Sequence, residues 1–385
     1  MVSETSITTK LHPGESRGPA TMAPASVAPS GIDRTVAGPR PAPGKQADES
    51  EAAARPPRWG IAGFGWVARD YMAPAIDAAG GRVTAIADPS PVSQASAESA
   101  SILAFDDTVS MLASGEVELL YVATPNNAHL GPVLAACGAG VPVLCEKPIA
   151  ATLADAEAIG RAVTESGVLY GTAFDQRHHP AHRRMAELIA EGAIGRPIAV
   201  RIVYACWVDP LWSADRAGAS NWRADPEAAG GGAVIDLALH GLDLAEMLVA
   251  EPLERLHIDL QRRIHDYPVD DGGVLSGRTE GGVLVTSHVA YNCREQLPRR
   301  RLEVLGDKGL LTAIDTMGQT AGGTVILTSD QGDFAVYFSE LSPFTVQAAA
   351  FQRAAAGEPH EFSITRDLDL MRLFDRAYQE ARACL

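Results

Sequence analysis

The stretch WGIAGFGWVA, residues 59–68, decides the fold, because an apolar strand runs directly into a glycine-rich turn. Residues 63–68 read G-x-G-x-x-A. In a strand–turn–helix unit the first glycine permits the tight turn, the second lets the backbone approach a pyrophosphate, and a small third residue lets helix and strand pack closely. Together with the N-terminus of the following helix, this pattern predicts a dinucleotide site formed by Gly63, Phe64, Gly65, Trp66, Val67 and Ala68.

An acidic residue follows the next apolar run. Asp88 ends that run about 20 residues after the turn, where dinucleotide-binding folds place the carboxylate that binds the adenosine ribose. A carboxylate there repels a 2′-phosphate, so we expect NAD rather than NADP as the cofactor.

Outward from this unit, short apolar runs alternate with helical patterns up to about residue 177. The runs are Trp59–Ala62, Val83–Ala87, Leu119–Ala123, Val141–Cys145 and Val168–Thr172. Such alternation predicts βαβ units and a doubly wound parallel sheet. Beyond residue 178 consecutive strands with period-two alternation, as in Val283–Val289, predict a mostly antiparallel sheet, and Thr365–Arg382 has the spacing of a closing helix. We therefore expect an α/β protein with domains at 58–177 and 178–385.

Composition narrows the class of protein. The 385 residues carry a formal net charge of -16, which disfavours nucleic acid as a partner. No apolar run reaches membrane-spanning length. The one dense basic run, Arg299–Arg301, is expected at an exposed strand edge. The five cysteines form no C-x-x-C pair, so we expect neither a metal site nor disulfides, but reduced thiols in a cytoplasmic enzyme.

Residues 1–57 have a different composition. They hold nine of the 25 prolines and almost no large apolar side chains. Such a segment buries too little surface to offset the entropy of ordering it, and we expect it to be disordered. A transit peptide, or a true start at an internal methionine such as Met22, would also account for it.

Polar residues follow two neighbouring strands of the parallel sheet. Residues 124–129 read T-P-N-N-A-H after one strand, and residues 146–148 read E-K-P after the next. Ligands of open α/β sheets bind at these carboxyl ends. We predict a cofactor or substrate edge here, with Lys147 bonding a substrate hydroxyl or stabilising oxyanion charge. The expected cofactor contacts are Thr124, Pro125, Asn126, His129, Glu146 and Lys147.

A second set of residues lies on a helix in the later half. Asp236 and His240 are four positions apart, so they share one helix face. A carboxylate one turn from an imidazole can fix its tautomer and raise its basicity, which suits a general base. The alternative is a capping aspartate and a packed histidine. Gly230–Gly232, just before the helix, would let its N-terminus approach a ligand closely.

Together these segments resemble the glucose–fructose oxidoreductase/inositol dehydrogenase/rhizopine-catabolism (Gfo/Idh/MocA) family over residues 58–385. The matching motifs are GFGWVA at 63–68, TPNNAH at 124–129, EKP at 146–148, WRADPE at 222–227, GGGAVIDLALH at 230–240 and LGDKG at 305–309. The resemblance implies an N-terminal Rossmann domain and a C-terminal α+β domain with a large open sheet, often the interface of a homo-oligomer. It also implies that Lys147 and His240 flank the reacting carbon, with His240 as general base and Asp236 as its partner, and that a cis peptide precedes Pro148.

Expected substrate contacts are less specific. Arg177, Trp222, Arg223 and His240 are the residues that the resemblance places near sugar hydroxyls. Trp207, Trp212 and Trp222 either stack on a sugar ring or pack the domain interface. Family members often have asparagine at the position of Asp175, a departure that could alter substrate preference.

The predicted function is NAD-dependent hydride transfer to or from a secondary alcohol of a sugar, a cyclic polyol or a related small molecule. Two alternatives remain open. One is a redox-neutral glycosidase that oxidises and then re-reduces its substrate, and the other is a non-catalytic dinucleotide-binding regulator.

Overall fold

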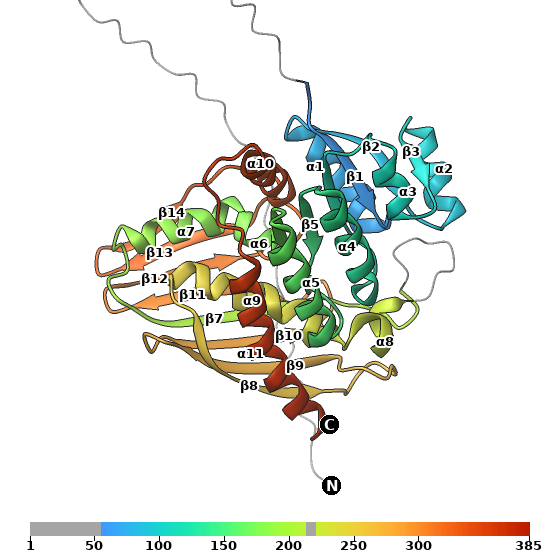
Figure 1. Ribbon diagram of the computed structural model, residues 1–385. Coiled ribbons are helices and arrows are strands. Elements are labelled where there is room, and N and C mark those ends of the chain that lie inside the picture. Colours follow the sequence, from blue (N-terminus) through green and yellow to red (C-terminus); the bar gives the residue numbers. More distant parts are fainter. Residues whose placement is uncertain (1–54, 213–220) are drawn as a thin grey trace, which may run out of the picture. The chain divides into compact units, whose positions relative to one another are not determined.

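The computed structural model describes residues 55–212 and 221–385, which form a six-stranded and an eight-stranded sheet with their helices (Figure 1). Nearly all of the expected disordered tail lies outside the described residues. None of the helices in these two ranges is both long and apolar enough to cross a membrane.

The first sheet is parallel throughout, as predicted. Its strand order is β3-β2-β1-β4-β5-β6, so the order reverses between β1 and β4. A crevice forms at such a reversal, outside the carboxyl ends of the strands. Only β3 went unpredicted, because three residues are too few to show a period. The strands are β1 (Arg58–Ala62), β2 (Arg82–Ala87), β3 (Leu103–Phe105), β4 (Leu119–Val122), β5 (Val143–Glu146) and β6 (Tyr170–Ala173).

Helices cover both faces of this sheet. One covering helix comes from the end of the chain: in α10, Phe344, Ala348 and Phe351 join the apolar cluster that holds Trp59 and Ile61 of β1. Residues predicted for the second domain therefore complete the core of the first. The helices that connect the parallel strands are η1 (Ala68–Met72), α1 (Ala73–Ala78), α2 (Pro91–Ser99), α3 (Thr108–Ala113), η2 (Asn126–Ala128), α4 (Leu130–Ala139) and α5 (Leu153–Ser166), and α10 spans Pro343–Ala355.

The second sheet has the order β14-β13-β12-β11-β7-β10-β9-β8. Only β7 and β10 pair in parallel, and every other pair is antiparallel, which confirms the predicted mostly antiparallel sheet. The strands are β7 (Pro197–Ala205), β8 (Leu253–Gln261), β9 (Gly272–Thr279), β10 (Leu284–Ala290), β11 (Arg300–Gly306), β12 (Gly309–Ile314), β13 (Thr324–Ser329) and β14 (Gly332–Val336).

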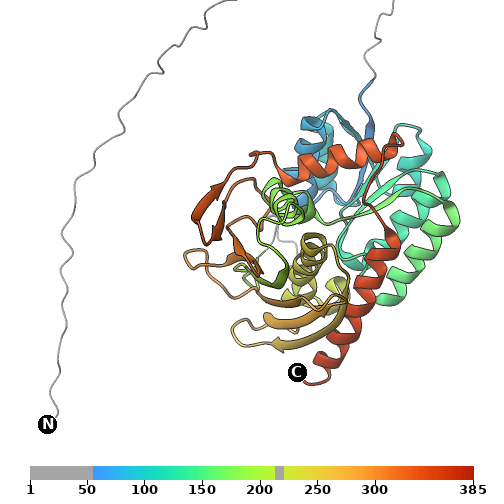
Figure 2. The same ribbon diagram turned by 90° about the vertical axis from the view of Figure 1, so that its left-hand side faces the viewer.

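The two faces of the second sheet differ. In β10, Val285, Ser287 and Val289 are buried, whereas the alternate residues Leu284, Thr286 and His288 are exposed. Helices pack on the buried face, and Figures 1 and 2 show α9 and α11 running along it. The opposite face is left without a covering helix in the described chain. Besides α9 (Ala233–Val249) and α11 (Ile364–Arg382), this half contains α6 (Asp175–His178), α7 (Pro180–Ala190), η3 (Trp222–Ala224) and α8 (Pro226–Ala229).

The N-terminus of α9 is anchored by the protein itself. The buried Asp270 carboxylate accepts hydrogen bonds from the amides of Gly232 at 3.1 Å and Val234 at 2.8 Å, and from the Tyr378 hydroxyl at 2.5 Å. A Cβ on Gly232 would lie 2.0 Å from the Asp270 carbonyl oxygen. The expectation that the glycine run admits a ligand is therefore wrong, because these glycines admit the protein's own backbone and so hold α9 in place.

Gly63 is required for a different close approach. Its φ is +83°, and an added Cβ would lie 2.7 Å from the amide nitrogen of Thr124 on the neighbouring β4 edge. The turn that should hold a pyrophosphate and the turn after β4 therefore meet without room for a side chain.

We predict that Gly63→Ala loses stability and dinucleotide affinity. Gly80→Ala is a matched control, because Gly80 has φ +81° with open space around it. The control should lose only the left-handed-conformation cost of about 1–2 kcal/mol. Gly63→Ala should lose a further ~1–3 kcal/mol from the clash. Chemical denaturation measures both, and equal losses in the two variants would contradict this role for Gly63.

Candidate active site

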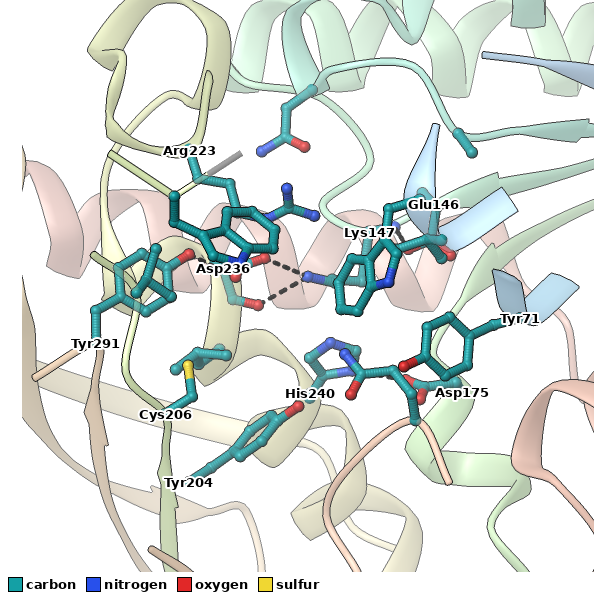
Figure 3. Close-up of a pocket in the computed structure, with 18 of the residues that line it drawn as sticks. Tyr71, Glu146, Lys147, Asp175, Tyr204, Cys206, Arg223, Asp236, His240 and Tyr291 are labelled. Carbon is teal, nitrogen blue, oxygen red and sulfur yellow. Dashed lines mark hydrogen bonds and ion pairs between the residues drawn. The ribbon is translucent and has the colours of Figure 1, made fainter. Parts of the chain in front are cut away.

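A cavity of about 380 Å³ lies at the carboxyl ends of the parallel strands and is walled by both halves of the chain. The first half contributes residues from its two sheet-edge turns and from the glycine-rich turn. The second half contributes α9 and strands of the mixed sheet. Figure 3 shows side chains from both halves pointing into this space. The lining residues that concern the chemistry are Trp66, Thr124, Asn126, Glu146, Lys147, Asp175, Tyr204, Trp222, Arg223, Asp236, His240 and Tyr291.

An ion pair crosses the cavity between the two halves. The Lys147 ammonium lies 2.5 Å from Asp236 Oδ1 and donates to the Asp236 carbonyl oxygen at 3.0 Å (Figure 3). The Tyr291 hydroxyl donates to the other carboxylate oxygen at 2.5 Å. Burial alone would raise the pKa of Asp236, but Lys147 and then Arg223 outweigh it and hold that pKa well below its ordinary value. Asp236 is therefore an ionised group that fixes the Lys147 amine.

His240 has another carboxylate partner than the one predicted. Its Nδ1 lies 3.1 Å from Asp175 Oδ1, and both side chains are buried. The expected pairing of His240 with Asp236 is wrong, because Lys147 and Tyr291 occupy both oxygens of Asp236. Asp236 and His240 both line the cavity, as their spacing on α9 predicted.

Asp175 is an anion in this arrangement. Burial raises its pKa, but the His240 ring, Lys147 and Gln176 together outweigh burial, so that the pKa lies below its ordinary value. A carboxylate facing Nδ1 favours the tautomer with the proton on that nitrogen, which leaves Nε2 free to accept a proton.

The Glu146-Lys147-Pro148 turn is held in place by an interior contact. The peptide before Pro148 is cis, as the family resemblance implied. Glu146 accepts a short hydrogen bond from the Tyr121 hydroxyl of β4, and burial raises the pKa of Glu146. Lys147 is thus presented by a turn whose neighbouring side chain faces an interior partner.

His129 is a positioning residue rather than a cofactor contact. It is fully buried, with Nε2 3.1 Å from the Thr124 carbonyl oxygen and Nδ1 3.0 Å from that of Pro148. Burial lowers its pKa to about 4, so the ring is neutral and its single N–H donates to only one of the two turns. The expected contact with the cofactor is therefore wrong, since the ring is enclosed between the two sheet-edge turns.

The glycine-rich turn fits a dinucleotide. The amide of Phe64 donates to Asp88 at 2.7 Å, so the carboxylate at the end of β2 lies beside the turn, where a ribose would be bound. Trp66 and Val67 line the cavity, and so do Thr124 and Asn126 at the neighbouring edge. These residues are the ones that would hold a nicotinamide dinucleotide, whose chemistry is to accept or supply a hydride.

Arg177 is not in the cavity. Its guanidinium forms a buried double hydrogen bond with Asp243 of α9, at 2.7 and 3.2 Å. The expected substrate contact is wrong, because α6 points this side chain at the interior face of α9. Trp222 and Arg223, expected at the substrate, do line the cavity.

Sequence reasoning missed several cavity residues. Tyr204 and Arg300 come from β7 and β11 of the mixed sheet, Tyr291 directly follows β10, and no site motif marks them. The expectation for the basic run is wrong for Arg299 and Arg300, which line the cavity, because β11 is an interior strand between β7 and β12. In the described ranges, no three His, Cys, Asp or Glu side chains are grouped so that they could hold a metal ion.

The dinucleotide-binding edge faces Lys147 and His240, each of which lies against its own carboxylate. This arrangement defines the class of the protein as a nicotinamide-dependent oxidoreductase. Comparison with known families agrees. The family model described as "Oxidoreductase family, NAD-binding Rossmann fold" matches residues 57–174, and the Gfo/Idh/MocA C-terminal domain matches residues 182–312. The chain belongs to the Gfo/Idh/MocA family of oxidoreductases.

Individual relatives have related activities. The 1,5-anhydro-D-fructose reductase of Ensifer adhaerens is 33% identical over 78% of this chain and 88% of its own length. The D-xylose 1-dehydrogenase [NADP(+)] of Haloarcula marismortui is 27% identical over 68% of this chain and 73% of its own. A solved levoglucosan dehydrogenase, in complex with NADH and levoglucosan, has a TM-score of 0.75 and 22% identity, covering 85% of this chain and 98% of its own. That last likeness shows the shared fold.

We predict that Asp175→Asn slows turnover while the fold is retained. Without the carboxylate, the imidazolium that forms as His240 takes a proton is less stabilised, so kcat should fall by at least about tenfold with a smaller change in KM. The acidic limb of the kcat/KM profile for alcohol oxidation should move to lower pH. Steady-state kinetics across pH measures both effects. An unmoved limb would show that Asp175 acts only on packing, and thermal unfolding controls for loss of fold.

Proposed function

We propose that this protein interconverts a secondary alcohol and a ketone on a sugar or cyclic polyol, with a nicotinamide dinucleotide as the hydride carrier. The observation that carries the proposal is that Lys147 and His240, from opposite halves of the chain, line one cavity at the dinucleotide-binding edge. The relatives' substrates, an anhydrosugar, a pentose and levoglucosan, support the sugar class.

The proton chemistry belongs to two side chains. His240 removes the proton of the reacting hydroxyl at Nε2, and Asp175 stabilises the resulting positive charge from the Nδ1 side. Lys147 donates a hydrogen bond to the same substrate oxygen and orients it, while Asp236 holds the amine in position. In the reverse direction His240 returns the proton to the oxygen.

Aromatic side chains suit a sugar ring. Trp66 and Trp212 meet edge to face with centroids 5.7 Å apart, and the Arg223 guanidinium lies 4.4 Å from the Trp222 ring centroid. All four line the cavity. Indole faces pack on the apolar faces of pyranose rings, so we place the substrate ring against these tryptophans.

We further propose NAD as the preferred cofactor and the cytoplasm as the location. The Asp88 carboxylate lies beside the glycine-rich turn and would repel a 2′-phosphate, although one relative uses NADP. All five cysteines are free thiols, which suits a reducing compartment.

The uncovered face of the mixed sheet is our proposed homo-oligomer interface. Leu284 of β10 and Val274 of β9 are 56% and 50% exposed on this face, an unusual place for apolar side chains on a strand. A second copy would bury them against the same face of its own sheet, as in a two-fold dimer.

We predict that Leu284→Asp converts the oligomer to a monomer, because the substitution would bury an unpaired charge at the interface. Size-exclusion chromatography with light scattering gives the mass. Leu134→Asp is the control, since Leu134 is 43% exposed on α4, away from this sheet. A wild-type monomer, or an oligomer that survives Leu284→Asp, would contradict this interface.

The activity itself is tested by a substrate screen that follows NADH absorbance with inositols, sugars and sugar acids, with NAD or NADP. Lys147→Met and His240→Gln should each reduce the rate by about 100-fold or more while NAD binding is retained. Lys308→Met and His257→Gln, both at exposed positions, should leave it unchanged. Substrate conversion without net NADH would instead indicate the redox-neutral glycosidase, and NAD binding without any conversion would indicate the regulator.

A further inference from the structure

The cavity contains more positive charge than its chemistry uses. Arg223, Arg299 and Arg300 line it in addition to Lys147. Because the protein as a whole has a net charge of -16, the positive charges in this cavity indicate that its ligand requires them. Resting on the function proposed above, we propose that the substrate carries an anionic oxygen group, a carboxylate or a phosphate ester, that binds between Arg223 and Arg300.

The placement of Arg300 follows from the pleat of β11. Successive residues of a strand point to opposite faces, and in β11 Leu302 and Val304 are buried on the helix side. Arg300 shares their side and so reaches the cavity. Arg301 points to the open face, where it pairs with Glu303 at 2.7 Å. The two neighbouring arginines therefore have separate surroundings.

The carboxylates of the cavity are already engaged. Asp236 bonds Lys147 and Tyr291, Asp175 lies against His240, and Glu146 bonds Tyr121. The fourth, Glu295, lies 3.3 Å from Arg299. None of them forms an ion pair with Arg223 or Arg300, although Asp236 lies close enough for Arg223 to lower its pKa.

Arg223 and Arg300 have no close ion-pair partner in the part of the chain that the structure describes. There, no carboxylate oxygen lies within 4.0 Å of either guanidinium. The Nε of Arg300 is buried and has no hydrogen-bond partner among these residues. An uncompensated buried donor is unfavourable, so the site is suited to a ligand that supplies the acceptor and the negative charge.

Arg300 lies at the part of the cavity that contains Tyr204 and His240. The Arg300 guanidinium lies 6.0 Å from the ring centroid of Tyr204, and that ring lies 5.9 Å from the His240 ring. Arg223 and Cys206 line the same cavity. An anion held there would be attached to a ring whose reacting carbon lies at His240.

A guanidinium presents a planar fork of donors that matches the two oxygens of a carboxylate or phosphate. A neutral sugar would contact the same donors through hydroxyls but would leave both charges uncompensated. Charge, and not ring shape alone, should therefore select the substrate.

The test is equilibrium binding to the NADH-saturated wild-type protein by calorimetry, which needs no turnover. The probes are D-glucuronate, D-galacturonate, D-gluconate and D-glucose 6-phosphate, against their neutral parents D-glucose and D-galactose. At least one acid or phosphate should bind about tenfold or more tightly than its parent, with an affinity that falls as salt rises. Which of the two binds distinguishes a carboxylate from a phosphate site.

The decisive variant is Arg300→Gln, with Arg161→Gln as the control, because Arg161 is exposed on α5 and does not line the cavity. Arg300→Gln should abolish most of the preference for the anion and leave neutral binding unchanged, whereas the control should change neither. Four outcomes would overturn the proposal: no preference for any anion, an equal loss for neutral and anionic sugars, an equal effect in the control, or a comparable loss of NADH affinity, which would assign Arg300 to the cofactor's phosphates. Preferential binding of neutral sugars together with hydride transfer would sink the anion site and leave the dehydrogenase standing. Anion binding without any hydride transfer would do the reverse.

Discussion

The ion pair between Lys147 and Asp236 is the contact on which the active cavity depends. It joins the carboxyl end of β5 to the first turn of α9, residues that are 89 positions apart. Both ends are held by the protein: the enclosed His129 ring packs between the turn at Pro148 and the turn after β4, and Asp270 fixes the first amides of α9. The distance between sheet edge and helix is thus set by backbone anchoring, and the Lys147 amine is positioned as a consequence.

Three carboxyl groups in one buried space take different electrostatic states. Burial disfavours the charge on each of them. Asp236 and Asp175 nonetheless have lowered pKa values, because Lys147 and His240 lie beside them. Glu146 has a raised pKa, because burial outweighs the opposing effects of Lys147 and of the hydrogen bond from the Tyr121 hydroxyl. Environments that separate the pKa values of neighbouring acids are a means of assigning them different roles. Here the two ionised acids each hold one of the two groups, Lys147 and His240, that we propose contact the reacting oxygen.

The second half of the chain also completes the core of the first half and positions α9. It returns through α10 to complete the apolar cluster around Trp59, and it places α9 so that Asp236 and His240 face the parallel sheet. Arg177, at the junction of the two halves, forms a buried ion pair with Asp243 of α9. In α6, at the junction, Arg177 therefore serves the packing of α9, whereas Asp175 lines the cavity together with residues of the mixed sheet.

The sequence by itself determined the features that depend on a few consecutive residues. The turn at Gly63, the edge position of Lys147 and the shared face of Asp236 and His240 follow from local backbone geometry, which a strand–turn–helix pattern or a four-residue spacing expresses directly. Only the tertiary structure decided which charges meet. Asp236 pairs with Lys147, whereas His240 pairs with Asp175, and Arg300 rather than Arg177 lines the cavity. Those outcomes depend on the direction in which a strand pleat or a packed helix points a side chain toward segments far away in the chain, and no local pattern carries that information.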